Sequence, residues 1–192
     1  MSRGHLIVVS APSGSGKTTI VKAILAKYPS MLFSVSATTR QKRETETDGR
    51  DYFFLPRNEF ERRIQADELV EWEEIYGNLY GTLKSEVEKV LTSGKSMLFD
   101  IDVKGGLSIK RSYPDDSLLI FIRPPSIEVL ETRLRNRKTE DEETFKRRMA
   151  RVTMELGMAP QFDHQVVNDD LRVAIEEVDK LILARTARGK QS

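Results

Sequence analysis

The 192-residue chain contains no cysteine. This absence excludes disulfide bridges, zinc sites built on thiolates and a thiol nucleophile. Long apolar runs are missing as well, because no stretch approaches the ~20 residues that a membrane-spanning helix needs. The first residues lead directly into an apolar strand pattern, so we expect no cleavable signal peptide. These absences together predict a cytoplasmic protein that does not enter a membrane.

An excess of charge of either sign is also missing. Lys and Arg number 31 and Asp and Glu 30, which gives a net charge of +1. Such a balance creates no general attraction to nucleic acid or to a membrane surface, so any basic patch must be local. With 39% hydrophobic and 32% charged residues, the chain has the composition of a globular protein. Its length suits one α/β domain with small inserted lobes.

A glycine-rich stretch, SGSGKTT at residues 13–19, lies between the apolar run 6–9 and a helical pattern at 20–25. Strand, glycine-rich turn and helix is the context of a phosphate-binding loop. Its glycines let backbone amides approach an anion, and the helix adds its positive dipole end. Lys17 can reach the outer phosphates, and the Thr18 hydroxyl can ligate Mg²⁺. The residues expected to bind ATP phosphates are Ala11, Pro12, Ser13, Gly14, Ser15, Gly16, Lys17, Thr18 and Thr19.

The phosphate-loop pattern G-x-x-x-x-G-K-[ST] is incomplete, because Ala11 occupies its first position. A plainer interpretation is a glycine-rich turn beside a surface lysine. The strand, the loop, the Lys-Thr pair and the helix occur together, and this combination favours phosphate binding.

Apolar strands near residues 5, 97, 117 and 165, separated by helical patterns, predict a parallel sheet flanked by helices with right-handed crossovers. Two stretches interrupt this alternation: a mixed-β segment with one helix, and an arginine-rich helical hairpin. Both fit loops that grow from the carboxyl ends of strands, where α/β folds bind ligands. The predicted division is a core at 1–33, 83–124 and 158–192, an inserted lobe at 34–82 and a lid at 125–157.

Local patterns give more detailed expectations. The alternation over residues 33–39 predicts one edge-like strand, and the alternation over 70–73 predicts another strand. Asn58, with Glu61 three residues later, is predicted to cap a helix. Thr82 is predicted to cap a helix that runs past Leu91.

Arg40 and Arg43 lie in a long polar segment that Tyr52 follows. Arginine forks match phosphate oxygens two at a time, so these residues suggest a second phosphate site facing the first. The alternative is a solvated charge run, which spacing alone would favour. Lys42 and Arg50 are assigned to that alternative.

Asp100 and Asp102 end an otherwise apolar strand. Carboxylates placed opposite a phosphate loop often engage Mg²⁺ or its waters, so we expect Asp100 to join Thr18 in holding the ion. For Asp102, a helix cap is the competing interpretation. A further carboxylate, Glu71, lies on an alternating strand beside Trp72.

Arg133 and Arg137 are one helical turn apart, and Arg148 lies on the next helix. A hinged pair of arginine helices can close over transferring phosphates and neutralise developing charge. The alternative is a set of surface arginines paired with the acidic residues 140–143. Arg135 and Arg151 are assigned to that surface set.

Short motifs spread over nearly the whole chain resemble those of the guanylate kinase family. In order, they are SAPSGSGKT (10–18), SVSATTR (34–40), GRDYFF (49–54), GNLYGT (77–82), DID (100–102), PPS (124–126) and VNDD (167–170). Each is weak alone, but in this order they are highly specific. Two departures occur. The family's Arg-Pro-Gly-Glu is here Arg43-Glu44-Thr45-Glu46, so the shape of that loop does not follow from the resemblance. Val103 and Lys104 replace the family residues after the second aspartate.

The resemblance implies a P-loop NTPase-type fold and the reaction of ATP with GMP or dGMP, with Mg²⁺, to give ADP and GDP or dGDP. It leaves the oligomeric state open. It places acceptor-phosphate contacts on Arg40, Arg43, Tyr52 and Tyr80, and guanine contacts on Ser36, Glu71 and Thr82, with Asp102 in the same site. Lid arginines fall on Arg133, Arg137 and Arg148, and Asn168 falls on the ATP side.

This chemistry agrees with the residues. A nucleoside monophosphate is largely ionised at neutral pH, since its second pKa is about 6, and it needs no general base. One carboxylate, Glu71, can accept both guanine N1–H and the exocyclic amine, whereas adenine presents an acceptor there. Two rival functions stay open: a kinase of another small acceptor, and a non-catalytic phosphopeptide-binding module of guanylate-kinase shape.

Overall fold

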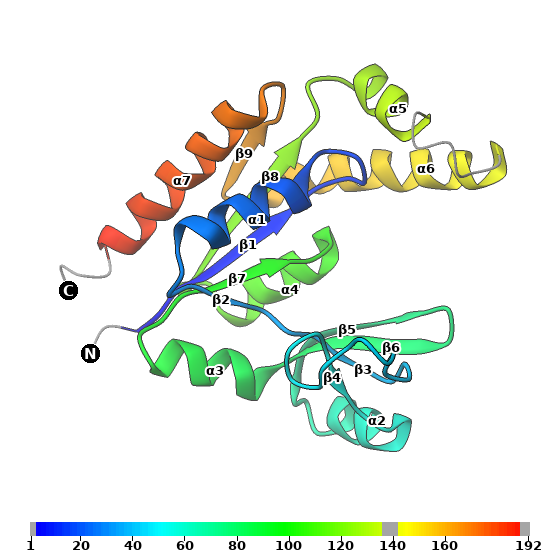
Figure 1. Cartoon of the computed structure of the whole chain (residues 1–192), viewed down its shortest axis with the longest axis vertical. Helices are drawn as coiled ribbons and strands as arrows, with labels where there is room; N and C mark the ends of the chain where they lie inside the picture. The colour runs from blue at the N-terminus through cyan, green and yellow to red at the C-terminus, as the bar shows by residue number, and fades with distance from the viewer. Residues whose placement is uncertain (1–2, 136–141, 189–192) are drawn as a thin grey trace.

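The structure is a computed structural model that describes residues 3–135 and 142–188. Its core is a five-stranded parallel sheet in the order β2-β7-β1-β8-β9 (Figure 1). The strands are β1 (Leu6–Ser10), β2 (Leu32–Phe33), β7 (Met97–Asp100), β8 (Ser117–Arg123) and β9 (His164–Val167). The four predicted strands are therefore confirmed, and β2 adds an edge strand beside β7.

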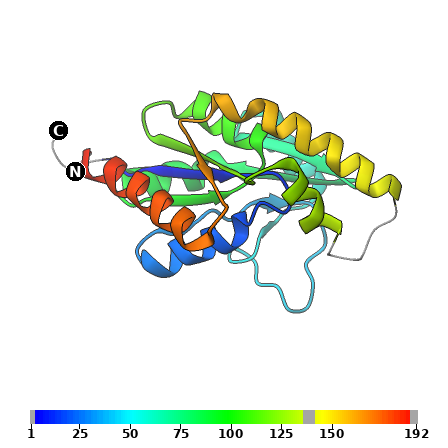
Figure 2. The same cartoon turned by 90° about the horizontal axis from the view of Figure 1, so that it is seen from above.

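Both faces of the core sheet are covered, which explains why its strands are apolar without alternation. Along β1, Leu6 and Val8 enter one hydrophobic cluster while Ile7 and Val9 enter another. The first cluster includes α3 (Lys84–Thr92) and α4 (Val103–Ser112), and the second includes α1 (Lys17–Lys27) and α7 (Leu171–Arg188). Figure 2 shows α1 and α7 together on one side of the sheet.

A second, four-stranded mixed sheet forms the inserted lobe, in the order β4-β3-β6-β5. Its elements are β3 (Ala37–Thr38), β4 (Phe53–Phe54), α2 (Arg57–Gln65), β5 (Leu69–Ile75) and β6 (Asn78–Leu83). One face of this sheet packs on Phe60 of α2 together with Ala37, Leu79 and Leu83. The opposite face is left for Tyr80 and Thr82, because side chains alternate along β6.

Three local expectations are wrong in this region. The single strand predicted over residues 33–39 is two short strands, β2 in the core sheet and β3 in the lobe, so this segment links the two sheets. Helix α2 begins at Arg57 after Pro56, and Asn58 is inside it rather than at its cap. Thr82 is in β6, and α3 begins only at Lys84, because Thr82 pairs with Glu71 in the β5–β6 ladder.

A β-bulge decides where the carboxylate of Glu71 points. In the ladder, Leu69 pairs with Leu83 whereas Glu71 pairs with Thr82, with the irregularity between them. In a regular strand, residues two apart share a face, so Leu69 and Glu71 would both point into the lobe core. The extra residue reverses this, and it lets Leu69 stay buried while Glu71 faces away from Phe60.

The lid contains α5 (Ile127–Arg135) and α6 (Glu142–Met158), followed by a 3₁₀ turn at Ala159–Gln161. Leu130 and Leu134 of α5 pack against Val152, with Phe145 and Met149 beside them, so α6 turns one apolar face to α5. Arg137 lies outside the described residues, as do residues 139–141, whose spacing with Glu142 is that of a capping box. Among the helices in the described ranges, none has the length and apolar character to cross a membrane.

Candidate active site

The predicted phosphate loop connects β1 to α1 and has the backbone that phosphate binding needs. Gly14 and Gly16 have φ of +89° and +86°, in the left-handed region that favours glycine. The loop turns back on itself through a 3.2 Å hydrogen bond from the Ser15 amide to the Pro12 carbonyl. The Ser15 hydroxyl is buried and has no hydrogen-bond partner among the residues that the structure describes. Unsatisfied donors at the start of a helix are suited to an anion.

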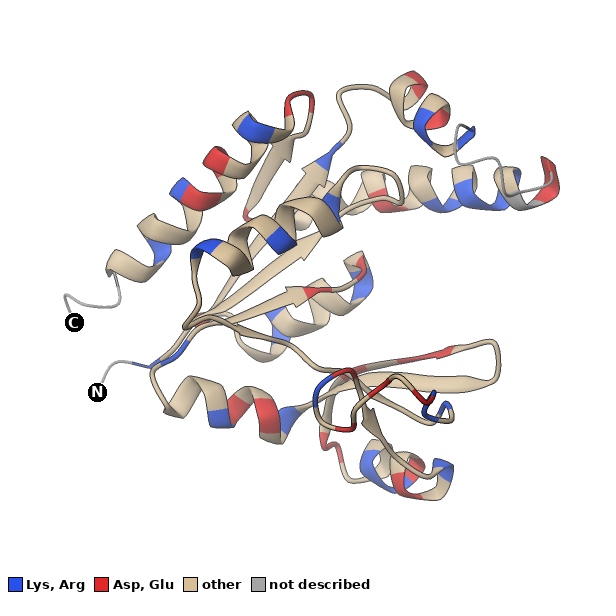
Figure 3. Cartoon of the chain, viewed as in Figure 1, with Lys and Arg blue, Asp and Glu red and all other residues tan. Residues whose placement is uncertain are grey.

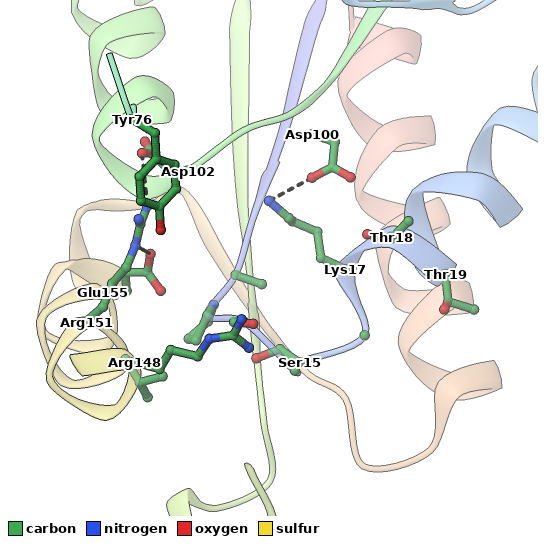
Figure 4. A pocket seen from close by; sticks show the side chains of 16 residues that line it. Ser15, Lys17, Thr18, Thr19, Tyr76, Asp100, Asp102, Arg148, Arg151 and Glu155 are labelled. Carbon is green, nitrogen blue, oxygen red and sulfur yellow. Dashed lines mark hydrogen bonds and ion pairs between the residues drawn. The ribbon is translucent and has the colours of Figure 1, made fainter. Parts of the chain in front are cut away.

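Lys17 is held at the end of the core sheet by a carboxylate of the neighbouring strand. Its Nζ forms a 2.7 Å ion pair with Asp100 Oδ1 and donates to the Ile101 carbonyl at 3.0 Å (Figure 4). Asp100 is brought there by strand register, since it pairs with Val9 of β1 just before the loop. The phosphate-loop lysine and the predicted metal ligand therefore lie in direct contact.

Asn168 supports the phosphate loop from behind. Its side chain is buried, and Nδ2 donates a 2.7 Å hydrogen bond to the Ser15 carbonyl. Arg133 of the lid donates to the Asn168 carbonyl at 3.4 Å. Asn168, the residue after β9, therefore fixes the shape of the loop, and its role on the ATP side stays a prediction.

We expect Gly16→Ala to disrupt this support. A Cβ on Gly16 would lie 2.3 Å from Asn168 Nδ2, and the backbone there has a positive φ. The expected result is a loss of MgATP affinity of at least about tenfold, the size of one displaced buried hydrogen bond, measured by titration calorimetry. Gly77→Ala is the matched control, because Gly77 has φ +78° but nothing within 4 Å of its added Cβ. Equal affinities in the two variants would contradict the role given to the loop backbone.

A cavity of about 590 Å³ joins the three parts of the chain. The phosphate loop lines one side, with Asp100 and Asp102 from the core, Tyr76 from the lobe and Arg148 from the lid. Figure 4 shows these residues around Lys17. From the predicted set, the cavity brings together Ala11, Pro12, Ser13, Gly14, Ser15, Gly16, Lys17, Thr18, Thr19, Asp100, Asp102 and Arg148.

The predicted acceptor-phosphate residues meet on the lobe instead. The Arg40 guanidinium lies 5.3 Å from the centre of the Tyr52 ring, and the Tyr52 ring contacts the Tyr80 ring edge-on at 6.1 Å. Arg40 also donates to both carboxylate oxygens of Glu46, at 2.6 and 3.1 Å. These bonds lower the pKa of Glu46 to about 2. Arg43 is exposed next to this group.

Glu46 closes the loop whose sequence departs from the family pattern. Its carboxylate accepts a 2.8 Å hydrogen bond from the Arg43 amide, and its own amide donates to the Arg43 carbonyl at 3.1 Å. The turn over residues 43–46 therefore forms with Glu44 and Thr45 at its centre. The fourth position, which keeps the family's glutamate, holds the loop and orients Arg40.

Glu71 and Thr82 form the base of the predicted guanine site. The Thr82 hydroxyl donates a 2.7 Å hydrogen bond to Glu71 Oε1. Burial raises the pKa of Glu71, the Thr82 bond opposes this rise, and the negative charges of Asp102 and Glu73 add to it. Ser36 is half-buried in the link before β3, where its carbonyl accepts from the Phe53 amide at 2.9 Å.

Asp102 is a helix cap, as the competing interpretation held, and it also borders the cavity. Its Oδ1 accepts a 2.8 Å hydrogen bond from the Gly105 amide at the start of α4. Its Oδ2 accepts from Arg151 of α6 at 3.3 Å. Arg151 is 53% exposed, as its assignment to the surface set predicts, but its partners are Asp102 and Glu155 instead of the acidic residues 140–143. Arg135 pairs with Glu142 as that set predicted.

Positive and negative side chains lie on different elements around the site. Figure 3 shows basic positions along α6 and acidic positions along β5. The acidic side chains of β5 include Glu71 and Glu73, next to Asp102 of the core. A cationic lid facing the phosphate loop and an acidic strand at the far end suit a ligand with a phosphate end and a base that offers hydrogen-bond donors.

A phosphate loop at the edge of a parallel sheet, sharing one cavity with an inserted lobe and an arginine-bearing lid, defines the class of P-loop nucleoside monophosphate kinases. The family model for guanylate kinase matches residues 3–185. The chain belongs to the guanylate kinase family.

Individual relatives agree with this membership. Guanylate kinase from Chlorobium luteolum is 49% identical over 175 residues, which cover 91% of this chain and 89% of the relative. Guanylate kinase from Salinibacter ruber is 51% identical over 174 residues, covering 90% and 92%. The crystal structure of guanylate kinase from Anaplasma phagocytophilum aligns with a TM-score of 0.71 at 28% identity, covering 97% of this chain and 88% of that one.

Proposed function

We propose that this chain transfers the γ-phosphoryl group of ATP to GMP, and also to dGMP. The observation that carries the proposal is that the Lys17 loop, Asp102 and the lid's Arg148 line the same cavity. Residues 1–33, 83–124 and 158–192 bind ATP in this account, 34–82 bind GMP and 125–157 form the lid. The chain acts on free nucleotides in the cytoplasm, without nucleic acid or membrane.

The loop residues fit a magnesium nucleotide. Thr18 and Asp100 supply oxygen donors that line the same cavity. Asp100 already forms an ion pair with the Lys17 ammonium group. Magnesium prefers such oxygens together with phosphate oxygens and water. When bound, it would neutralise charge on the phosphates. Lys17 holds the outer phosphates of ATP against the loop amides.

Transfer needs positioning rather than a base. The acceptor phosphate is already ionised near pH 7, since its second pKa is about 6. Arg40 and Arg43, with Tyr52 and Tyr80, hold this phosphate on the lobe, and Arg40 is oriented by Glu46. Arg148, Arg133 and Arg137 of the lid neutralise the transferring group and exclude water.

Selection of guanine rests on Glu71. With Thr82 bonded to one carboxylate oxygen, the other is left for guanine N1–H and the exocyclic amine, while Ser36 and Asp102 complete the pocket. Adenine presents an acceptor at the same edge, and the buried carboxylate would then lose its partners.

This assignment predicts a pH dependence of GMP binding. The folded pKa of Glu71 is raised, chiefly by burial, so the carboxylate protonates at a higher pH than an ordinary glutamate. A protonated Glu71 has lost one acceptor, so the KM for GMP should rise as pH falls through that raised pKa, while the KM for MgATP stays flat. An equal acid response of both KM values would contradict the assignment.

A coupled assay with MgATP and a panel of GMP, dGMP, AMP, UMP and shikimate tests the function. We expect turnover with GMP and dGMP and little with the other three. Preference for another acceptor would establish the rival kinase function. Phosphopeptide binding with no turnover of any acceptor would establish the binding module.

A further inference from the structure

Arg151 joins the lid to the acceptor side of the cavity. It lies in the middle of α6, and its guanidinium reaches Asp102, 49 residues earlier in the chain, at the start of α4. Figure 4 shows Arg151 beside Asp102 and Glu155, on the opposite side of the view from Lys17. The residue thus connects two elements that belong to different parts of the fold.

Both ends of this connection are anchored. Arg151 Nε donates a 2.9 Å hydrogen bond to Glu155, one helical turn later, whose side chain is only 6% exposed. Asp102 is held at its other oxygen by the Gly105 amide. The guanidinium therefore fixes the second oxygen of Asp102, and the rotamer of this aspartate is set from two sides.

The surroundings of Arg151 are mostly acidic. A small cavity of about 110 Å³ is lined by Arg151 together with Glu73 of the lobe, Asp102 and Lys104 of the core, and Glu155. Glu71 lies next to Asp102, since a Cβ added to Gly105 would lie 3.5 Å from Glu71 Oε2 and 3.4 Å from Asp102 Oδ1. Repulsion between the carboxylates at the guanine site grows if Arg151 is removed, because the positive charge that bonds Asp102 is lost.

We propose that Arg151 is a positioning residue for GMP, which acts through Asp102 by fixing its orientation and compensating its charge beside Glu71. The inference rests on the proposed guanine site. It implies that the lid contributes to acceptor binding as well as to the phosphates, because α6 carries both Arg148 and Arg151.

Steady-state kinetics of Arg151→Gln test the proposal. We expect the KM for GMP to rise about tenfold, the effect of losing one charged hydrogen bond, with kcat and the KM for MgATP changed by no more than about twofold. Arg151→Lys, which keeps the charge, should recover most of the loss. Arg172→Gln is the matched control, because Arg172 also pairs with a glutamate four residues later, on α7.

A double-mutant cycle separates this role from a purely structural one. In an Asp102→Asn background, Arg151→Gln should add no more than about a twofold further rise in the KM for GMP. Fully additive effects, or a loss confined to kcat or to MgATP, would overturn the proposal. The parent chain is assayed first: if it fails to phosphorylate GMP, the proposed function falls, whereas normal parent activity with an unaffected Arg151→Gln variant overturns this inference alone.

Discussion

Lys17→Ala should abolish most phosphoryl transfer while leaving the fold intact. Lys17 is the loop cation that reaches the outer phosphates, and nothing else in the described loop carries a positive charge. Removing one fixed donor to a developing charge costs about 10²–10³ in kcat, and we expect a loss at or above this range. The measurement is kcat with saturating MgATP and GMP.

Lys22→Ala provides the control for Lys17→Ala. Lys22 lies on the same helix, α1, but is exposed to solvent. Circular dichroism should give both variants the spectrum of the parent, because neither lysine belongs to the two hydrophobic clusters that hold the core sheet and its helices together. Turnover of Lys17→Ala within about tenfold of the parent would remove Lys17 from the mechanism.

Glu71→Gln should narrow the preference for GMP over AMP by at least about 10², since a charged acceptor that reads two donors is replaced by an amide with one acceptor and one donor. The bulge before Glu71 points its carboxylate away from the lobe core, and Thr82 already bonds one oxygen. The measurement is kcat/KM for each monophosphate at fixed MgATP, and the KM for MgATP should not change.

Glu74→Gln is the control for Glu71→Gln. Glu74 lies on the same strand, but it is half exposed and pairs with Arg57 on the outside of the lobe. It should leave the GMP to AMP ratio as in the parent. If the Glu71 variant also kept the parent's GMP to AMP ratio, residues other than Glu71 would discriminate guanine from adenine.

Local sequence was sufficient for the phosphate loop. The apolar strand, the two glycines, Lys17 and the following helix are contiguous, and each element is specified by its own residues. The capping role of Asp102 was also open to prediction, because the cap and the Gly105 amide are three residues apart. For such features, residues that are close in the sequence are also close in the fold, so the sequence is enough to predict the contact.

Other features depend on contacts between distant elements. Thr82 has the residue type and the flanking pattern of a helix cap, but its hydroxyl is taken by Glu71 across the β5–β6 ladder. The bulge that separates Leu69 from Glu71 has no signal in their residue types. In the sequence, nothing distinguishes Arg151 from the arginines near it. Only the packing of α6 against the start of α4 brings it to Asp102.

Glu46 shows an intermediate case. It was hidden in a run of charged residues, yet it keeps the family's glutamate and pairs with Arg40 six residues earlier. A contact between residues so close in sequence can be predicted when the charged run is compared with the family motif.

In the proposed function, two nucleotides are bound end to end between fixed cations of the core, the lobe and the lid. The most direct test of this arrangement is the affinity of adenosine and guanosine joined by five phosphates, measured by calorimetry with Mg²⁺. The account predicts one ligand per chain, bound far more tightly than ATP or GMP alone, with both Lys17→Ala and Arg43→Ala weakening it. Affinity no better than that of ATP, or a loss in only one of the two variants, would contradict it.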